Sequence, residues 1–416
     1  MEILCVVYYM IAIIYIFYSF YSYYITPNLI FATIQIVMFI GITGYADYTM
    51  NADRQLVFIY MLALIFFIIS SAFNFKRYNL KNRKVEVSEN EELSQIQRIV
   101  IWIMVTVAVL ACSYLFARSG GNVFIQSLKS FLGNSDYSIK VGRKNILDVA
   151  GVGYIYQFRT IILPILTVYL INAGGIKEKN IAYAIFPLMI IFILGTGQRG
   201  GFVMFVLIWA TALLLVHRYY GESNLRKLII LGVGFILLFS ITTILNGRVS
   251  NDGTVVGAMM ARIMDDNQAC AIRGFRYIID QPVQWGVDWF SQIIDILPGK
   301  NEYQSLATKI FARMNGGSTA GTAPACLWGS AFYNWGWLGV TLFPWILGHF
   351  YSYVYMCFVK KPSNKLRIFL YSGEFVILGM WVSDGPMVLF NQGFITVVLM
   401  IWVISFSRRF VFGAIK

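Results

Sequence analysis

The sequence has very little charge for its length. Of 416 residues only 13% are charged, whereas 58% are hydrophobic and the mean hydropathy is +0.67. A soluble domain of this size could not bury so much apolar surface, which excludes the soluble globular classes. The composition predicts a polytopic membrane protein.

Histidine and cysteine are also scarce. The two histidines, His217 and His349, and five cysteines without C-x-x-C spacing cannot easily form a His-rich metal site or a Ser-His-Asp triad. The sequence also lacks a Gly-rich phosphate loop, a dinucleotide fingerprint and any nucleic-acid-binding module. We therefore expect no metal, no cofactor, no nucleic-acid partner and no ATP-driven pump.

Long apolar segments make up most of the chain. Helices of about 17–25 apolar residues cross a bilayer core, and such segments predict an all-α fold with about eleven transmembrane helices, in one transmembrane domain over 1–416. The long uncharged segment 326–359 should either bend near Pro344 or begin outside the membrane. The expected spans are 3–25, 28–46, 55–73, 99–117, 154–173, 181–196, 201–217, 228–245, 326–350, 368–384 and 386–406.

The distribution of basic residues predicts the orientation. Short basic loops mark the cytoplasmic side of a membrane protein, and 18 of the 33 Lys and Arg residues lie in five short segments. These segments are 75–98, 174–180, 217–227, 360–367 and the tail after 407. With eleven spans, the N-terminus and two long segments, 118–153 and 246–325, are then expected on the external side.

The stretch GTGQRGG, Gly195 to Gly201, places a permanent cation at the external end of an apolar segment. A guanidinium beside glycine backbone N–H groups suits an anionic ligand, so Arg199, Gly200 and Gly201 are candidates for binding a phosphate. The alternative is an arginine that only extends its side chain to the membrane surface.

The segment 246–325 is rich in arginine. Arg248 follows a predicted span, and Arg262, Arg273 and Arg276 fall on one stripe of a predicted amphipathic helix over 258–280. These arginines could hold a diphosphate, or they could form a solvated face with i,i+4 pairs such as Arg262 and Asp266. The following residues 281–299 predict a short helix in the membrane interface.

The order of these features resembles the O-antigen polymerase (Wzy) family. The resemblance covers about 95–406 and rests on GTGQRGGF, the Arg-rich external loop, and the T-x-P and Y-N-x-G-x-x-G elements of TAPACLWGSAFYNWGWLG. It implies a metal-independent glycosyltransferase of the integral-membrane C type (GT-C) at the periplasmic face of a bacterial inner membrane. Such an enzyme would transfer a growing glycan en bloc from undecaprenyl diphosphate to an incoming lipid-linked repeat unit, with a chain-length regulator as a further candidate partner.

The resemblance and the chemistry together give the candidate site. Fixed arginines would meet the charge that develops on the departing diphosphate, and a general base would come from Asp265, Asp266, Asp280 or Glu302. Many relatives have a glutamate before the Y-N-x-G element, where this sequence has Ser330. The resemblance therefore assigns no carboxylate role to this position. Candidate catalytic residues are Arg199, Arg248, Arg262, Arg273, Arg276, Asp266 and Glu302, and candidate substrate-binding residues are Gly200, Gly201, Arg143, Arg313, Tyr333 and Asn334.

Three other functions remain open on the sequence. An O-antigen ligase shares the architecture but typically has a histidine in the re-entering external segment, which is absent here. A lipid-linked oligosaccharide flippase would place cations along the interior of its bundle rather than in one outer loop. A peptidoglycan-type polymerase or an unrelated permease is the third alternative.

Overall fold

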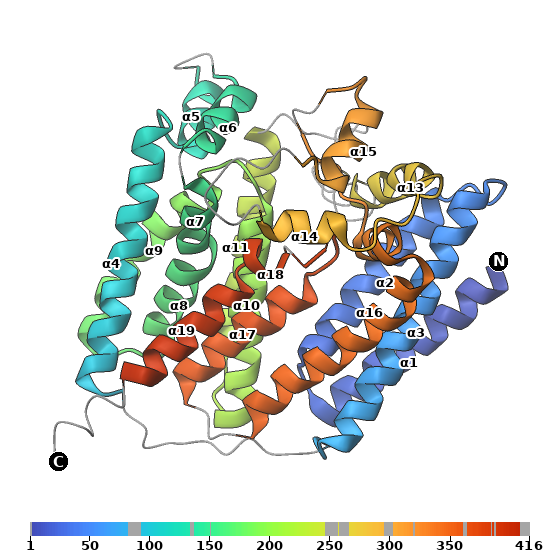
Figure 1. Ribbon diagram of the computed structural model, residues 1–416. Helices are drawn as coiled ribbons and strands as arrows, with labels where there is room; N and C mark the ends of the chain where they lie inside the picture. Colours follow the sequence, from blue (N-terminus) through green and yellow to red (C-terminus); the bar gives the residue numbers. More distant parts are fainter. Residues whose placement is uncertain are drawn as a thin grey trace. The chain divides into compact units, whose positions relative to one another are not determined.

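The computed structural model is all-helical over the residues that it describes (Figure 1). The described residues are 2–81, 93–133, 137–149, 151–245, 257, 266–294, 303–318, 321–360, 364–383, 385–386 and 388–407. The chain divides into two compact units, of which unit 1 comprises 1–83, 259–360 and 378–390, and unit 2 comprises 84–258, 361–377 and 391–416. Both units contain helices of membrane-spanning length, and the single domain over 1–416 stays a prediction.

Among the described residues, unit 1 holds four long helices and three short ones, together with the last two residues of α17 (Lys365–Gly379) and the first three of α18 (Val388–Asn391). The long helices are α1 (Glu2–Tyr23), α2 (Pro27–Tyr45), α3 (Asn51–Arg77) and α16 (Leu327–Val359), and the short ones are α13 (Asp266–Ile278), α14 (Val287–Ile294) and α15 (Leu306–Met314). Helices α3 and α16 approach each other closely at Gly348. A Cβ on this residue would lie only 2.8 Å from the Phe67 carbonyl oxygen. Small residues permit such backbone approach between membrane helices.

Buried amides connect the long helices of unit 1. Asn28 on α2 donates to Ser71 on α3 at 2.8 Å and to Ser352 on α16 at 3.3 Å. Gln35 accepts a hydrogen bond from the Trp328 indole at 2.9 Å. Because unpaired polar groups are costly in an apolar interior, these bonds favour one arrangement of α2, α3 and α16.

Helix α16 is interrupted at Gly336, not at Pro344 where the sequence suggested a bend. Gly336 has φ 57° and ψ −142°, which is outside the helical region and is readily adopted only by glycine. Pro344 lies within the helical part of α16. The bend therefore depends on backbone freedom at Gly336.

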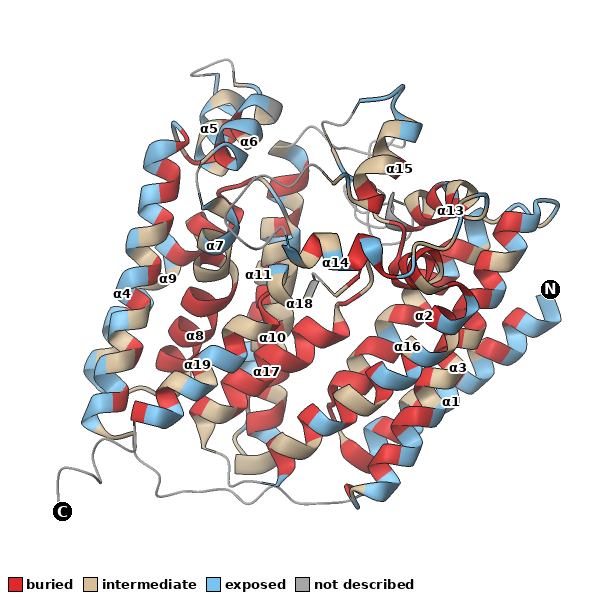
Figure 2. Cartoon of the chain, viewed as in Figure 1, coloured by how far each residue is buried: buried red, intermediate tan, exposed pale blue. Residues whose placement is uncertain are grey.

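Unit 2 surrounds a buried central helix. Every residue of α8 (Leu163–Ala173) from Leu163 to Ile171 is buried, as Figure 2 shows. In contrast, α11 (Leu225–Leu245) exposes a series of large apolar side chains, as expected of a helix facing lipid. The other elements of unit 2 are α4 (Gln95–Arg118), α5 (Val123–Phe131), α6 (Ile139–Leu147), α7 (Val152–Gln157), the π-helical η1 (Phe158–Ile162), α9 (Ile176–Leu194), α10 (Gly200–Tyr220) and α19 (Phe394–Ser407). Two further helices are divided between the units: α17 (Lys365–Gly379) belongs to unit 2 up to residue 377, and α18 (Val388–Asn391) belongs to it only with its last residue.

The helices support a membrane-embedded protein. Within the described residues, 8 helical stretches are long and apolar enough to cross a membrane. They match the first five expected spans, the spans at 201–217 and 228–245, and the one that begins at 326. Three further expected spans correspond to α9, which begins with three charged residues, and to the shorter α17 and α19. The total of about eleven spans stays a prediction.

Candidate anion site at the 195–201 junction

The predicted site residues are divided between the two units. Unit 2 contains Arg143, Arg199, Gly200 and Gly201, whereas unit 1 contains Arg273, Arg276, Arg313, Tyr333 and Asn334. Arg248, Arg262, Glu302, Asp265 and the side chain of Asp266 lie outside the described residues. The two groups are therefore described separately.

The junction between α9 and α10 in unit 2 is closely packed at its first glycine. The Gly195 carbonyl accepts a hydrogen bond from the Val123 backbone N–H at 2.7 Å. A Cβ on Gly195 would lie 2.3 Å from the Asn122 amide and 2.4 Å from the Phe116 ring. Glycine is needed at this position because any side chain would displace its neighbours.

Two more glycines of the junction also have a packing role. Gly197 has φ +67°, a left-handed conformation that favours glycine, and its carbonyl accepts a hydrogen bond from the Arg143 guanidinium. A Cβ on Gly201 would meet the Thr160 methyl group at 3.0 Å. Only Gly200, which is exposed, has open space around its Cβ position. Packing thus accounts for three of the four glycines, and Gly200 is the one beside which a ligand has room.

Arg199 lies at the start of α10. It occupies the N-cap position, where no side chain accepts a hydrogen bond from the first turn. Its Nη1 donates to the Thr243 hydroxyl at 2.6 Å, and its guanidinium carbon lies 4.9 Å from the centre of the Phe239 ring. Helix N-termini attract anions through their first N–H groups and their dipole. Arg199 and the start of α10 thus place two sources of positive potential beside Gly200.

The cavity at this junction is small. It has a volume of about 10 Å³ and is lined by Gly197, Arg199 and Thr242, among others. This volume fits about one water molecule. A diphosphate would therefore have to lie over the exposed surface at Gly200 instead of inside this cavity.

Arg159 is a third cation at the junction and was not among the predicted site residues. Its side chain is 2% exposed, and its Nη1 donates to the Ile193 carbonyl at 2.8 Å and to the Thr196 hydroxyl at 2.7 Å. It belongs to the π-helical turn η1, a feature that is frequent at functional sites. The Ile193 carbonyl lies in the last turn of α9, where the helix dipole favours a cation. The guanidinium thus fixes the end of α9 and the residues that follow.

Arg159 has no carboxylate partner among the described residues, and its buried Nε has no hydrogen-bond partner there. The sequence signal that could have identified Arg159 is an arginine within an otherwise apolar span, which is a functional suspect by default.

In unit 1, Arg276 forms a bidentate ion pair with Asp53. Its Nε and Nη2 lie 2.9 and 2.7 Å from the two carboxylate oxygens, and these hydrogen bonds raise the pKa of Arg276. The Asp53 side chain is only 1% exposed, so the pair attaches α13 to the start of α3. Arg273 and Arg313 are exposed. Arg276 therefore has a structural role, the ion pair with Asp53, which the sequence analysis did not predict.

The Tyr333–Asn334 pair of α16 positions the chain around α14. The Asn334 side chain is fully buried, donates to the Ser330 carbonyl at 3.0 Å and accepts from the Trp289 backbone N–H at 3.3 Å. Trp289 in turn donates its indole N–H to the Ser330 hydroxyl at 2.9 Å. These contacts indicate that Asn334 and Ser330 hold α14 in place.

Asp288 on α14 is a buried carboxylate that the sequence analysis did not select. It accepts hydrogen bonds from the Leu306 backbone N–H at 2.8 Å and from Gln292 at 2.9 Å. Burial raises the pKa of Asp288, and these hydrogen bonds partly oppose the shift. Since Leu306 begins α15, Asp288 connects α14 to α15. The signal for Asp288 is its position between Trp285 and Trp289 in a helix with one apolar face.

A lysine and two tyrosines lie near this carboxylate. Lys309 on α15 donates to the Tyr303 hydroxyl at 3.2 Å and lies 4.4 Å from the centre of that ring and 6.0 Å from the Tyr333 ring. Burial raises the pKa of Tyr303 to about 12, and the charge of Asp288 adds to this shift. Tyr333, a predicted substrate-binding residue, therefore belongs to a Lys–Tyr cluster.

No group of three or more His, Cys, Asp or Glu side chains within the described parts of the chain is arranged to hold a metal ion. Comparison with known protein families, with curated proteins and with solved structures finds no match to this chain.

Proposed function

We propose that this protein is a membrane glycosyltransferase that polymerises undecaprenyl-diphosphate-linked oligosaccharide repeat units at the periplasmic face of the bacterial inner membrane. The enzyme transfers the growing glycan en bloc to the newly delivered repeat unit. The proposal follows from the sequence resemblance to the O-antigen polymerases.

One observation in the structure supports it most directly. The exposed start of α10 has no side-chain cap, carries Arg199 at its N-cap position and has open space at Gly200. A phosphate group at this place would accept hydrogen bonds from first-turn N–H groups and from a guanidinium. Arg159 and Arg143 bind the junction backbone through Ile193 and Gly197, and so act as positioning residues.

The reaction requires negative charge to be stabilised as the diphosphate departs. The acceptor hydroxyl oxygen attacks the anomeric carbon, the bond from that carbon to the diphosphate oxygen breaks, and undecaprenyl diphosphate leaves with the electron pair. Fixed cations and helix N–H groups stabilise the developing charge without reorganisation. The hydroxyl proton passes to a carboxylate, for which Asp265, Asp266, Asp280 and Glu302 remain the candidates.

The test is complementation of a deletion strain, followed by gel analysis of its lipopolysaccharide. Loss of a polymerase leaves single repeat units on the lipid core, whereas loss of a ligase leaves none. We expect Arg199→Ala to give single units and Arg199→Lys to give shortened ladders, because lysine keeps the charge but loses the planar fork of donors.

The matched control is Arg218→Ala, which removes an exposed arginine from the opposite end of α10. This variant should give full ladders. Full ladders from Arg199→Ala at normal expression would contradict the assignment of Arg199, and absence of O-units in the deletion strain would favour the ligase.

A further inference from the structure

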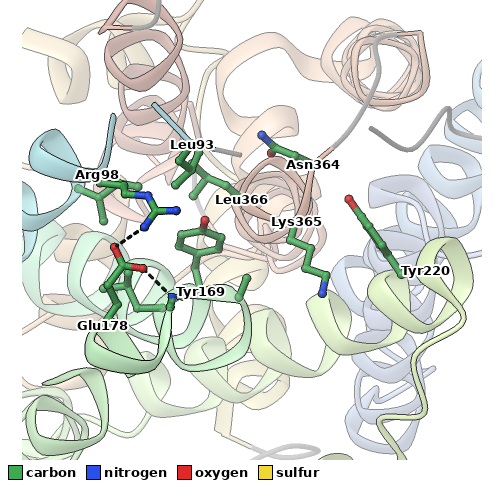
Figure 3. Close-up of a pocket in the computed structure, with 13 residues that line it drawn as sticks. Leu93, Arg98, Tyr169, Glu178, Tyr220, Asn364, Lys365 and Leu366 are labelled. Carbon is green, nitrogen blue, oxygen red and sulfur yellow. Dashed lines mark hydrogen bonds and ion pairs between the residues drawn. The ribbon is translucent and has the colours of Figure 1, made fainter. Parts of the chain in front are cut away.

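Unit 2 also contains a polar cavity, at the end of α9 opposite to the 195–201 junction. Its volume is about 330 Å³, and its walls come from the start of α4, the α8–α9 turn, the end of α10 and the start of α17. Figure 3 shows the polar side chains that line it. These are Arg98, Tyr169, Glu178, Tyr220, Asn364 and Lys365.

Two cations on separate helices line this cavity. Figure 3 shows Arg98 and Lys365 on either side of the Tyr169 ring. The Arg98 guanidinium lies 3.8 Å from a Glu178 oxygen, beyond hydrogen-bond distance, and donates no hydrogen bond to any side chain or carbonyl in the described part of the chain. Lys365 donates to Glu222 and lies 5.2 Å from the Tyr220 ring centre. As far as the described residues go, most of the five donors of Arg98 are therefore available to a ligand.

The side chain of Tyr169 also lines the cavity. Tyr169 is 5% exposed as a whole residue and belongs to the cavity wall. In Figure 3 its oxygen points into the space beside Arg98. A phosphate oxygen in this space could accept a hydrogen bond from the Tyr169 hydroxyl group.

Two helix N-termini contribute to the same cavity. Gly174 and Gly175 precede α9, and Asn364 caps α17 by accepting a hydrogen bond from the Arg367 backbone N–H at 2.9 Å. Helix N-termini favour anions. The one carboxylate in the wall, Glu178, accepts from the Gly175 N–H at 2.7 Å and so is engaged in capping α9. The lining residues Arg98, Lys365 and Glu178 sum to a charge of +1, and Glu222, the ion-pair partner of Lys365, lies outside the lining.

We propose that this cavity binds a phosphate ester of low net charge, with Arg98 and Lys365 contacting the phosphate oxygens and Tyr169 donating its hydroxyl hydrogen. The cavity volume is at the lower end of the range for small-molecule sites, which suits a glycerophosphate-sized group. The phosphate comes either from the headgroup of an anionic phospholipid or from a soluble ester. This site is separate from the proposed transferase site and does not depend on it.

The experiment is thermal unfolding of the full chain, purified in a neutral maltoside detergent, during titration with three probes at constant ionic strength. The probes are dihexanoyl phosphatidylglycerol, glycerol 3-phosphate and inorganic phosphate. We expect at least one probe to raise the Tm saturably. Arg98→Gln should raise its half-saturating concentration about tenfold or more, because charge-assisted hydrogen bonds are lost.

Two further variants make the result specific. Tyr169→Phe removes one hydroxyl group without changing the charge and should also weaken binding. It provides the test of the proposed site if Arg98→Gln does not fold. Lys177→Gln removes an exposed cation from the same turn, outside the cavity wall, and should leave binding unchanged.

The outcomes separate the two sources of phosphate. Binding of the lipid alone assigns the cavity to a headgroup, and binding of the soluble probes assigns it to a free ester. No saturable shift with any probe would overturn the proposal. So would unchanged binding in Tyr169→Phe, or an equal loss in Lys177→Gln and Arg98→Gln, which would indicate attraction to the whole basic surface.

Discussion

Arg159 is the residue at which stability and function are expected to separate most clearly. Burying a guanidinium without a carboxylate partner is costly, and replacing buried charges by apolar side chains of similar volume is often neutral or stabilising. We predict that Arg159→Met keeps the Tm within a few degrees of the wild type, because it removes the buried charge but leaves the Ile193 carbonyl unpaired.

Under the proposed function, the same substitution should shorten the polymer ladder strongly, since the end of α9 would no longer be fixed. Thermal unfolding and the lipopolysaccharide gel measure the two effects on the same variant. A large fall in Tm together with an intact ladder would show that Arg159 is purely a stabilising residue.

Asp288 should make the stability of unit 1 depend on pH. Burial raises its pKa in the folded protein, so the folded state binds a proton more tightly than the unfolded state. The stability it contributes is therefore full below the unfolded pKa and is lost as pH rises through the folded pKa. We predict that the Tm of the wild type, relative to Asp288→Asn, rises as pH falls from about 7 to about 4.

The measurement for Asp288 is a pair of Tm profiles against pH in the same detergent. The difference between them isolates this one carboxyl group from all other titrating groups. A difference that stays constant, or that favours Asp288→Asn increasingly at acidic pH, would contradict the raised pKa.

At the scale of single residues, the sequence identified positions better than it identified roles. Arg199 lies at a helix start as expected, because the change from apolar to glycine-rich sequence marks that boundary. The partner of Arg276 is Asp53, 223 positions away, and no local pattern contains such a pairing. Asp288 was missed because a single carboxylate in an amphipathic helix normally faces water.

Helix α16 is the element whose shape depends most on one glycine. Gly336 adopts φ 57° and ψ −142°, and a Cβ there would approach the Val283 side chain at 3.3 Å. We predict that Gly336→Ala destabilises the protein by about 1–3 kcal/mol, the usual cost of a strained backbone conformation. It should also weaken the hydrogen bond from the Gly286 N–H to the Asn334 carbonyl, which lies two residues before the bend.

The matched control is Gly232→Ala in α11, where a Cβ meets no atom within 4 Å. Alanine should stabilise that helix by roughly 0.5–1 kcal/mol, because glycine is unfavourable within a helix. Opposite shifts in Tm for the two variants are the expected result. Equal shifts would mean that the bend at Gly336 is not required.

The elements themselves were largely predictable, because apolar runs of membrane length specify helices directly. For segment 326–359 the sequence suggested either a bend near Pro344 or a start outside the membrane. The helix accommodates Pro344, and the break occurs at Gly336, where glycine permits a conformation closed to other residues. The cavity beside Tyr169 was not predictable, because four segments that are distant in sequence form its wall.

At the scale of the whole molecule, the predicted orientation can be compared with the contacts inside each unit, and it stays a prediction. Within unit 2, the cavity wall includes residues of four segments that the sequence assigns to the cytoplasmic side, whereas Arg143, from the segment 118–153 that is predicted to be external, donates to the Gly197 carbonyl. Within unit 1, Arg276 from the external loop pairs with Asp53 at the predicted external end of α3. Within each unit, these contacts join segments that are predicted to lie on the same side, and the orientation itself rests on the positive-inside rule.

The orientation is tested by placing single cysteines in a variant without the five native ones. We predict that cysteines at the exposed positions Asn51 and Leu132 react with a membrane-impermeant maleimide in intact spheroplasts. Cysteines at Arg77 and Lys177, also exposed, should react only after permeabilisation. Asn51 and Arg77 are the two ends of α3, so each serves as the control for the other in one helix.

A reversed labelling pattern would have consequences for both proposed sites. It would place Arg199 and the start of α10 in the cytoplasm, where a polymerase of flipped repeat units could not meet its substrate, and the proposed function would fail. The phosphate-ester cavity would then face outward but would keep its geometry, so the binding experiment at Arg98 would still apply. The expected pattern, together with loss of ladders in Arg199→Ala, would place the cation and the chemistry on the same side of the membrane.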